Sequence, residues 1–290
     1  MMKMKMVDGP LEESPPFDIS KCLSVVICVK NGEDTIGHLL ESISSIPLRD
    51  LIVVDGLSKD STLDICKRYR TRILSDEGNG LAFARQMGAE HASGDIIAYI
   101  DSDTLIPSSE VLEKMCAEMI EKEWGAIHPK VVDPRPAKNI WERAQDDYYR
   151  TTLNREGERR YVPCMICLMR RELVLEYGFD PAFTFGSEDV DLYHRLWKDG
   201  VKIGVSREVA YHLHRSTFSD LFHQKMSYGS GDMRFIRKHG TYLSLTTPAY
   251  ILLLGTIISL KTKKPQHIIF YLIWSIALML GMIKGLFRKR

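Results

Sequence analysis

Short apolar runs that alternate with segments of helical pattern constrain the fold of this chain more than any other feature. The runs are rich in β-branched residues, which favours buried strands, and they cover residues 23–29, 51–54, 72–74 and 95–100. Helical spacing lies between them over residues 34–44, 61–69 and 81–91, with Asp60 as a predicted N-cap. This order predicts an α/β fold in which βαβ units build a Rossmann-like, mostly parallel central sheet.

The pattern continues less regularly in the next hundred residues. Residues 162–169 form another apolar run, and a helix is predicted over 190–198, ending at Gly200. Residues 124–160 mix prolines, aromatic residues and charges, so no element type is assigned to them.

The composition leaves room for one sizeable α/β domain with an appendage, since 44% of the 290 residues are hydrophobic. A formal net charge of +1 provides no broad basic field, which argues against nucleic-acid binding. The six cysteines are not spaced as in a disulfide scaffold. Cys164 and Cys167 form a C-x-x-C pair, but no second pair completes a zinc site. We therefore expect buried thiols in a reducing, cytosolic compartment.

Changes of composition divide the chain into a leader, a catalytic domain, an amphipathic segment and a hairpin, predicted over residues 1–20, 21–215, 216–240 and 241–290. The leader lacks the apolar core of a signal peptide, which indicates a disordered segment. The amphipathic segment has apolar residues at helical spacing, Phe218, Leu221, Phe222 and Met226. Its basic residues nearby are Lys225, Arg234, Arg237 and Lys238. This pattern is typical of a basic helix that lies at a membrane surface.

Two strongly apolar stretches, residues 243–260 and 268–287, are separated by a linker with three lysines. Roughly 20 apolar residues suffice for a helix to cross a bilayer, so a hairpin of two spanning helices is the favoured interpretation. It keeps the catalytic domain on the cytosolic side of the cell membrane, yet it places the lysines outside, against the positive-inside tendency. Two alternatives stay open: a shallow interfacial hairpin, and buried helices of a soluble protein.

Three aspartates stand where predicted strands end: Asp55 after the second run, and Asp101 and Asp103 after the fourth. Ligands of parallel α/β sheets bind beyond the carboxyl ends of the strands. The two carboxylates of the D-x-D segment can reach one metal ion, and hard oxygen ligands favour Mn²⁺ or Mg²⁺. Such an ion neutralises a departing nucleoside diphosphate. Because D-x-D also occurs in turns and caps, its meaning depends on the other motifs.

Five ordered motifs over about residues 23–239 resemble those of family 2 glycosyltransferases with a GT-A fold. The family's opening strand-turn, its V-D-D-G-S-x-D-x-T and its N-x-G-x-x-x-A-R-N-x-G region have counterparts in VVICVKN, VDGLSKDST and NGLAFARQMG. The D-x-D then falls where the family places it. The most specific match is to G-x-E-D-x-D-L-x-x-R-L-x-x-x-G, which appears here as GSEDVDLYHRLWKDG.

The resemblance implies a nucleotide-sugar donor bound along the first four motifs, with contacts from Val29, Asn31, Asp55, Arg85, Asp101, Ser102 and Asp103. Asp55 is the aspartate expected at the donor's base. The chain departs from the family at Cys28, Val29 and Lys30, so backbone contacts are expected there. Gly56 and Leu57 also replace the usual Asp-Gly. Taken singly, Asp55 fits a turn and Arg85 fits a solvated helix charge.

The E-D motif implies an inverting mechanism in which Asp189 is the general base and takes a proton from the acceptor hydroxyl. Glu188 is the neighbouring alternative. Capping of the following helix by Ser187 or Asp189 would explain these residues without catalysis.

The resemblance also implies a metal site that consists of Asp101, Asp103 and His212, with His214 as the alternative ligand. A histidine in this place is also compatible with a structural role. Arg170 and Arg171 match an R-R that precedes the E-D motif. They would contact phosphate or acceptor, or else form surface ion pairs.

These expectations describe an inverting, metal-dependent transferase that moves a hexosyl unit from a nucleotide sugar to a lipid-linked glycan acceptor. GDP-mannose is the first choice of donor, and UDP-glucose and UDP-N-acetylglucosamine are alternatives from surface polysaccharide synthesis. Gln224 lies where membrane-bound cellulose-synthase-like members carry Q-x-x-R-W, but Ser227 and Tyr228 replace Arg and Trp, which argues against a processive polymerase.

Two rivals from other classes stay open. One is a non-catalytic nucleotide-binding membrane scaffold, against which the intact E-D and D-x-D motifs argue. The other is a nucleotidyltransferase, which would need a Gly-rich, Lys-containing triphosphate loop that the sequence lacks near Val29.

Overall fold

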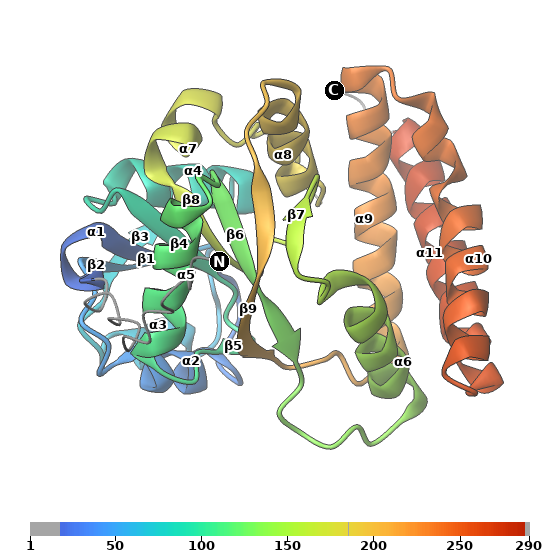
Figure 1. Ribbon diagram of the computed structural model, residues 1–290, viewed down its shortest axis with the longest axis horizontal. Helices are drawn as coiled ribbons and strands as arrows, with labels where there is room; N and C mark the ends of the chain where they lie inside the picture. Colours follow the sequence, from blue (N-terminus) through green and yellow to red (C-terminus); the bar gives the residue numbers. More distant parts are fainter. Residues whose placement is uncertain (1–17, 185, 288–290) are drawn as a thin grey trace, which may run out of the picture.

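A curled central sheet organises the protein, seen in a computed structural model that describes residues 18–184 and 186–287. Within these residues the strand order of the sheet is β3-β2-β1-β4-β8-β6-β9-β5, with β7 paired to β9 (Figure 1). A short helix, α1 (Ile19–Cys22), leads into the sheet, so it begins inside the predicted leader. Residues 1–17 of the leader and the last three basic residues lie outside the described part of the chain.

The first half of the sheet is parallel, as predicted. Its strands are β1 (Leu23–Val29), β2 (Asp50–Asp55), β3 (Arg72–Ser75) and β4 (Ile96–Ile100). The crossover helices are α2 (Ile36–Ile43), α3 (Thr62–Cys66) and α4 (Leu81–His91). β1 pairs with both β2 and β4, so the winding of the chain reverses at β1. The crevice at the carboxyl ends of β1 and β4 is therefore the expected ligand position.

The second half of the sheet is mixed. β8 (Ile166–Arg170) runs antiparallel to β4 and to β6 (Ala126–Val132), while β9 (Ile203–His212) runs parallel to β6. Short antiparallel strands on β9 complete it, β5 (Thr104–Leu105) and β7 (Gly157–Arg159).

Helices α5, α7 and α8 accompany this half, over Ser109–Glu121, Arg171–Tyr177 and Glu188–Lys198. Residues 124–160, left unassigned from the sequence, contain β6, β7 and α6 (Ile140–Tyr148), and α6 continues into a π-helix, Tyr149–Leu153.

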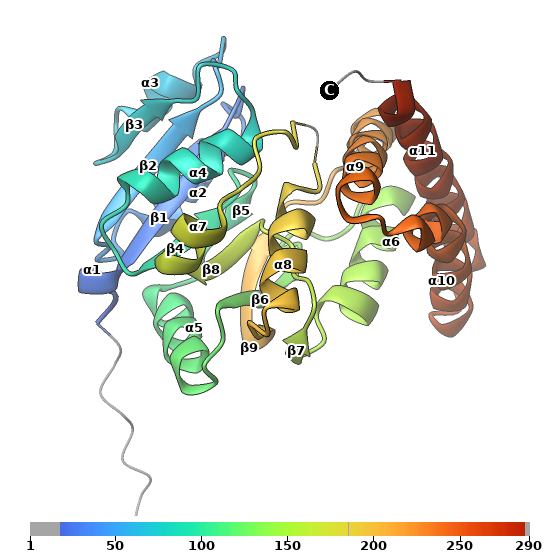
Figure 2. The same cartoon turned by 90° about the horizontal axis from the view of Figure 1, so that it is seen from above.

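Two apolar layers hold the helices to the sheet. One face packs against α2, α3 and α5, and the other packs against α4, α7 and α8 (Figure 2). The parallel strands are buried on both faces, which explains why they read as continuous apolar runs rather than alternating ones. Gly88 allows α4 to approach the sheet, because a Cβ there would lie 2.3 Å from Val26.

Three long helices form a separate layer beside the sheet: α9 (Phe218–His239), α10 (Thr247–Lys261) and α11 (Ile268–Phe287). Single 3-10 turns, Tyr242–Thr246 and Pro265–His267, connect them. α9 was predicted at a membrane surface, but it lies between the catalytic domain and α11 (Figures 1 and 2). A Cβ at Gly229 would lie 2.0 Å from the Leu278 carbonyl oxygen, so small residues let these two helices touch along their backbones.

The outer surface of this layer is apolar. Among the described residues, two helical segments are long and apolar enough to cross a membrane, Tyr242–Lys261 and Pro265–Phe287. Their exposed side chains include Leu253, Ile257, Leu260, Ile276, Met279 and Ile283. So many exposed apolar side chains on one surface are unusual where that surface faces only water.

Candidate active site

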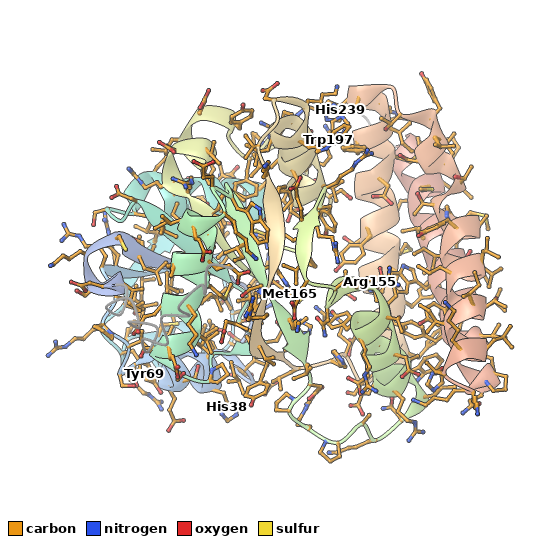
Figure 3. The ribbon with its side chains drawn as sticks, viewed as in Figure 1. His38, Tyr69, Arg155, Met165, Trp197 and His239 are labelled. Atoms are coloured by element: carbon orange, nitrogen blue, oxygen red, sulfur yellow. The ribbon has the colours of Figure 1, made fainter. Side chains whose placement is uncertain are left out.

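The metal-binding candidates meet because a short strand pair brings them together. Asp101 follows β4, and its N–H donates to the carbonyl of Met165, 2.8 Å away, near the centre of the molecule (Figure 3). Three residues later β5 begins, and it pairs with β9 so that Thr104 lies opposite His212. This register places the His212 Nε2 atom 3.6 Å from Asp103 Oδ1.

His212, rather than His214, faces the carboxylates. Burial lowers the pKa of His212 to about 4, so its ring is neutral and able to ligate a metal at neutral pH. His212 Nδ1 is buried and has no hydrogen-bond partner in the described structure. His214 points to α6 instead, where its Nε2 lies 2.8 Å from Asp146 Oδ1. The geometry therefore favours the first of the two predicted histidines.

Arg85 joins the D-x-D motif to the E-D motif. Its side chain is buried; Nη1 donates to Glu188 Oε1, and Nη2 donates to Asp101 Oδ1 over 3.3 Å. A second bond from Nη2 reaches the Cys164 carbonyl oxygen, also over 3.3 Å. Arg85 is thus not a solvated helix charge, since it neutralises two carboxylates from separate motifs.

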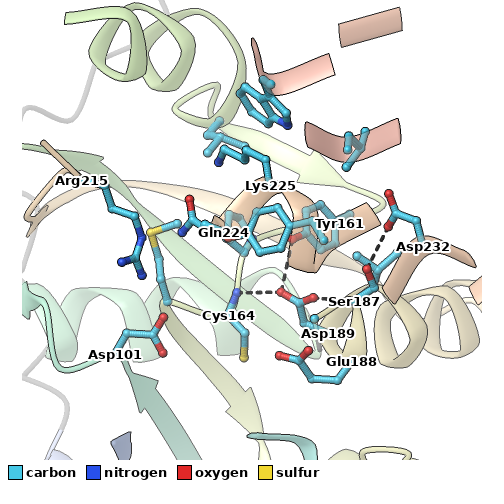
Figure 4. Close-up of a pocket in the computed structure, with 18 of the residues that line it drawn as sticks. Asp101, Tyr161, Cys164, Ser187, Glu188, Asp189, Arg215, Gln224, Lys225 and Asp232 are labelled. Atoms are coloured by element: carbon cyan, nitrogen blue, oxygen red, sulfur yellow. Dashed lines mark hydrogen bonds between the residues drawn. The ribbon is translucent and has the colours of Figure 1, made fainter. Parts of the chain in front are cut away.

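Glu188 and Asp189 are adjacent in sequence but lie in different surroundings. Glu188 is 3% exposed, and burial raises its pKa to about 7 against the opposing effect of Arg85. Asp189 is only half-buried and lines the cavity described below. Its Oδ2 accepts from the Tyr161 hydroxyl at 3.2 Å and from the Cys164 N–H at 3.3 Å (Figure 4).

Helix capping does not account for this pair. Asp189 is the second residue of α8, so it lies inside the helix rather than at its N-cap. Ser187 occupies the N-cap position with a left-handed backbone, φ +63°, but makes no capping hydrogen bond from its side chain. Its hydroxyl donates to Asp232 on α9 instead, over 2.8 Å.

The predicted donor-binding residues divide into two groups. Arg85, Asp101 and Asp103 line the cavity, whereas Val29, Asn31, Asp55 and Ser102 are not among its lining residues. Asp55 ends β2, beside β1, and its Oδ1 is buried without a hydrogen-bond partner in the described structure. Asn31 fixes the loop after β2, because its amide oxygen accepts from the Lys59 N–H at 2.8 Å. Their contact with a nucleotide stays a prediction.

A cavity of about 300 Å³ contains the carboxylates of both motifs. One side comes from the sheet and α8, and carries Asp101, Asp103, Glu188, Asp189 and His212. The other side comes from the helical layer, and carries Gln224, Lys225, Tyr228, Ile251, Trp274 and Leu278 (Figure 4). None of these residues of the second side was predicted in the site, although Gln224 was noted for its match to Q-x-x-R-W.

Arg170 and Arg171 are not part of this cavity. The Nε of Arg170 donates to the Trp124 carbonyl oxygen at 3.1 Å, and that of Arg171 donates to the Ala89 carbonyl oxygen at 2.9 Å. Neither of the two roles weighed from the sequence, phosphate contact or surface ion pairing, describes these backbone contacts.

The chemistry of the donor set fits a hard divalent cation. Asp101 and Asp103 supply carboxylate oxygens, and His212 supplies a neutral imidazole. The described residues hold no group of three or more His, Cys, Asp or Glu side chains already close enough to enclose an ion. A bound ion would therefore take its remaining ligands from substrate phosphate or water, as Mg²⁺ commonly does.

Comparison with known proteins supports the assignment of the fold. The mannosyltransferase PcManGT from Pyrobaculum calidifontis, in complex with GDP-Man and Mn²⁺, superposes with a TM-score of 0.66 at 17% identity, covering 98% of this chain and 92% of that one. Staphylococcus aureus TarS in complex with UDP has a TM-score of 0.52 at 16% identity, over 91% and 92% of the two chains. These structures show the GT-A fold, and the first covers the C-terminal helical layer as well.

Sequence relatives agree with the structures. Glycosyltransferase AglE of Haloferax volcanii is 23% identical over 223 residues, 73% of either chain. The validoxylamine A glucosyltransferase of Streptomyces hygroscopicus is 26% identical over 64% of this chain, which spans about half, 54%, of that relative. A family profile, Glycosyl transferase family 2, matches residues 24–178, more than half of the chain. The chain therefore belongs to glycosyltransferase family 2.

Proposed function

We propose that this enzyme transfers a hexosyl unit from a nucleotide sugar, with inversion, to a lipid-linked glycan acceptor at the cytosolic face of the cell membrane. The observation that carries the proposal is the common cavity: Asp101, Asp103 and His212 lie in the same 300 Å³ space as the accessible carboxylate of Asp189. Reaction partners held on these two groups would meet inside it.

The chain's own residues account for the proton and for the positioning of the donor. Asp189 accepts the proton of the acceptor hydroxyl as that oxygen bonds to the anomeric carbon and the bond to the donor's diphosphate oxygen breaks. A single displacement inverts the anomeric centre and needs no covalent nucleophile. Arg85 holds Asp101 in place through a buried ion pair. A divalent ion bound at Asp101, Asp103 and His212 would neutralise the leaving diphosphate.

GDP-mannose remains the first choice of donor, supported by the likeness to a mannosyltransferase with bound GDP-Man. UDP-N-acetylglucosamine is supported by the same kind of observation, since the similar structure of TarS was solved with that donor. UDP-glucose is the remaining alternative. The cavity residues named above would bind a metal ion and the donor's diphosphate. All three donors have that diphosphate, so these residues do not distinguish them.

The membrane part of the proposal is supported by the apolar outer surface of α10 and α11. A lipid-linked acceptor fits this arrangement, because the same two helices contribute Ile251, Trp274 and Leu278 to the cavity.

The deciding experiment is a panel of nucleotide sugars offered to the full chain in detergent, with Mn²⁺, with Mg²⁺ and with chelator. We expect one donor to be hydrolysed slowly without acceptor and quickly transferred with a lipid-linked acceptor. Binding of nucleotide with no turnover of any donor would support the scaffold instead. Formation of a nucleotide sugar from a sugar phosphate and a nucleoside triphosphate would support the nucleotidyltransferase.

A further inference from the structure

Lys225 is a buried cation without a carboxylate partner. It comes from the middle of α9, is 7% exposed, and lines the cavity (Figure 4). Its ammonium lies 4.1 Å from the ring centre of Trp274 and 5.0 Å from that of Tyr228. No ion pair of Lys225 occurs among the residues that the structure describes. Burying an unpaired ammonium is costly, and aromatic faces offset only part of the cost.

Arg215 is a second cation in the same cavity. It follows β9, and its Nε is buried without a hydrogen-bond partner in the described part of the chain. In this same part, no carboxylate lies within ion-pair distance of its guanidinium. In Figure 4 the Arg215 guanidinium points toward Asp101, while Lys225 lies on the side of the cavity that faces the helical layer, and both are apart from the Asp189 and Glu188 carboxylates.

We propose that Arg215 and Lys225 bind the phosphate of the acceptor, an amphiphile whose apolar chain lies against Ile251, Trp274 and Leu278. This inference rests on the proposed function, and it names the acceptor's chemical class: a lipid phosphate or phosphodiester. A guanidinium and an ammonium are the groups that proteins use for phosphate. The apolar residues beside them belong to the helices that carry the exposed apolar surface.

The test compares two probes of one chain length, an isoprenyl phosphate and the corresponding isoprenol, titrated against the full chain in detergent. We expect tighter binding of the phosphate. Arg215→Gln and Lys225→Met should each weaken it by about tenfold to a hundredfold, the usual effect of losing a charge-assisted hydrogen bond. Isoprenol binding and nucleotide-sugar binding should stay unchanged. Lys198→Met, at the exposed end of α8, is the matched control.

Three results would overturn this assignment. Equal affinity for isoprenyl phosphate and isoprenol would show that the cavity has no site for the phosphate. Weaker nucleotide-sugar binding in both variants, with acceptor binding intact, would assign the cations to the donor's diphosphate. Unchanged phosphate binding with a lower melting temperature would make Lys225 structural. Each outcome is separate from failure of the proposed function, because transfer by the wild-type enzyme is measured independently.

A different observation concerns how the helical layer meets the membrane. α9 is fixed to the catalytic domain at both ends: Phe218 packs on Trp141 of α6, and His239 Nε2 lies 2.7 Å from Asp191 of α8 (Figure 3). α11 follows α9 closely, since a Cβ at Gly281 would lie 2.0 Å from the Met226 carbonyl oxygen.

The connection between α10 and α11 is also fixed to the catalytic domain. Lys264 Nζ lies 3.0 Å from Asp147 Oδ1 on α6. At the other end of α11, Arg237 of α9 donates to the Leu286 carbonyl oxygen over 2.7 Å. Both helices therefore run alongside the catalytic domain instead of projecting from it (Figures 1 and 2).

We infer that the α10–α11 hairpin lies in the plane of one membrane leaflet and does not cross the bilayer. A crossing would bring the catalytic domain, which extends beside the helices over their whole length, to the depth of the hydrocarbon core (Figure 1). In the plane, the exposed apolar side chains enter the acyl region while Lys261 and Lys263 stay at the headgroups. This arrangement replaces the spanning hairpin favoured by the sequence.

Labelling with a membrane-impermeant maleimide in vesicles of known orientation distinguishes the two arrangements. Cys22 and Cys28, the partly exposed native cysteines, are first replaced by alanine. Gln266→Cys then marks the connection between the helices, and Glu176→Cys on the exposed face of α7 marks the catalytic domain. We expect both to react from the same side. Reaction from opposite sides would establish a spanning hairpin, and a protein absent from the membranes would instead contradict the membrane part of the proposed function.

Discussion

Replacing Asp189 by asparagine is the sharpest test of the proposed chemistry. The amide keeps the size of the side chain, and its oxygen can still accept from the Tyr161 hydroxyl and the Cys164 N–H, which lie 3.2 and 3.3 Å from the carboxylate. It cannot accept the proton of the acceptor hydroxyl. We therefore expect transfer to fall by roughly 10²–10⁴-fold, the usual contribution of a general base. This corresponds to about 3–5 kcal/mol of transition-state stabilisation.

The matched variant is Glu188→Gln, which changes the neighbouring carboxylate in the same way. Glu188 is buried on Arg85, so its loss of charge leaves the guanidinium with Asp101 as its remaining carboxylate partner among the described residues. We expect a lower melting temperature and weaker donor binding, since a hydrogen bond between charged groups contributes roughly 1.5–3 kcal/mol. Asp189→Asn should leave both quantities nearly unchanged, because its carboxylate is half-exposed and joins no ion pair in the described structure.

Three measurements on each variant decide the matter: donor affinity by calorimetry, melting temperature, and transfer at saturating donor. Glu176→Gln, on the exposed face of α7, controls for a surface change of charge. Near-normal transfer by Asp189→Asn together with loss of transfer in a stable Glu188→Gln protein would assign the general base to Glu188 instead. Normal transfer by both variants would refute the general-base assignment.

Further predictions concern the metal, the membrane and Lys225. Activity should require Mn²⁺ or Mg²⁺, and Asp103→Ala should abolish it without changing the melting temperature; full turnover in excess chelator contradicts this. The full chain should sediment with membranes, and truncation before Leu243 should weaken this association; an untruncated chain that stays in the supernatant without detergent argues against it. Lys225→Met should raise the free energy of unfolding at pH 7. Burial lowers the pKa of Lys225 to about 7 from 10.5, so the unfolded state binds more protons between these values. The gain should therefore shrink as the pH rises toward 10.5, and a gain independent of pH excludes this cause.

The sequence predicted the parallel half of the sheet well because local signals and tertiary environment agree there. Residues 23–29 and 81–91 became β1 and α4 with unchanged bounds, since β-branched runs buried on both faces leave little ambiguity. The predicted helix over 61–69 is shorter in the structure, Thr62–Cys66. Residues 124–160 could not be assigned from the sequence because β6 pairs with β8 and β9, about forty and eighty residues further along, and no local pattern encodes such partners.

The site residues also divide into those that local sequence patterns predict and those that depend on tertiary packing. Motifs located Asp101, Asp103, Glu188 and Asp189 because strand ends and helix starts fix their positions locally. The side of the cavity that comes from the helical layer depends instead on how α9 packs on α11. Lys225 stood among the basic residues of a predicted amphipathic helix, and that pattern indicates a surface position. In the structure Lys225 lines the cavity instead, and glycines let α9 and α11 pack closely, which a helical hydropathy pattern does not reveal.

The contrast between Glu188 and Asp189 follows from helix geometry. Successive side chains on a helix point about 100° apart, so the two adjacent carboxylates at the start of α8 line the same cavity in different surroundings. One turns inward, where burial raises its pKa to about 7 and Arg85 connects it to Asp101. The other is half-exposed, and its carboxylate accepts from a hydroxyl and two backbone N–H groups. The acceptor hydroxyl can reach the half-exposed carboxylate of Asp189 more easily than the buried carboxylate of Glu188, whose oxygen is already held by Arg85. In the proposed mechanism the sequence order Glu-Asp therefore gives each residue its role: Glu188 connects the start of α8 to Asp101 through Arg85, and Asp189 removes the proton.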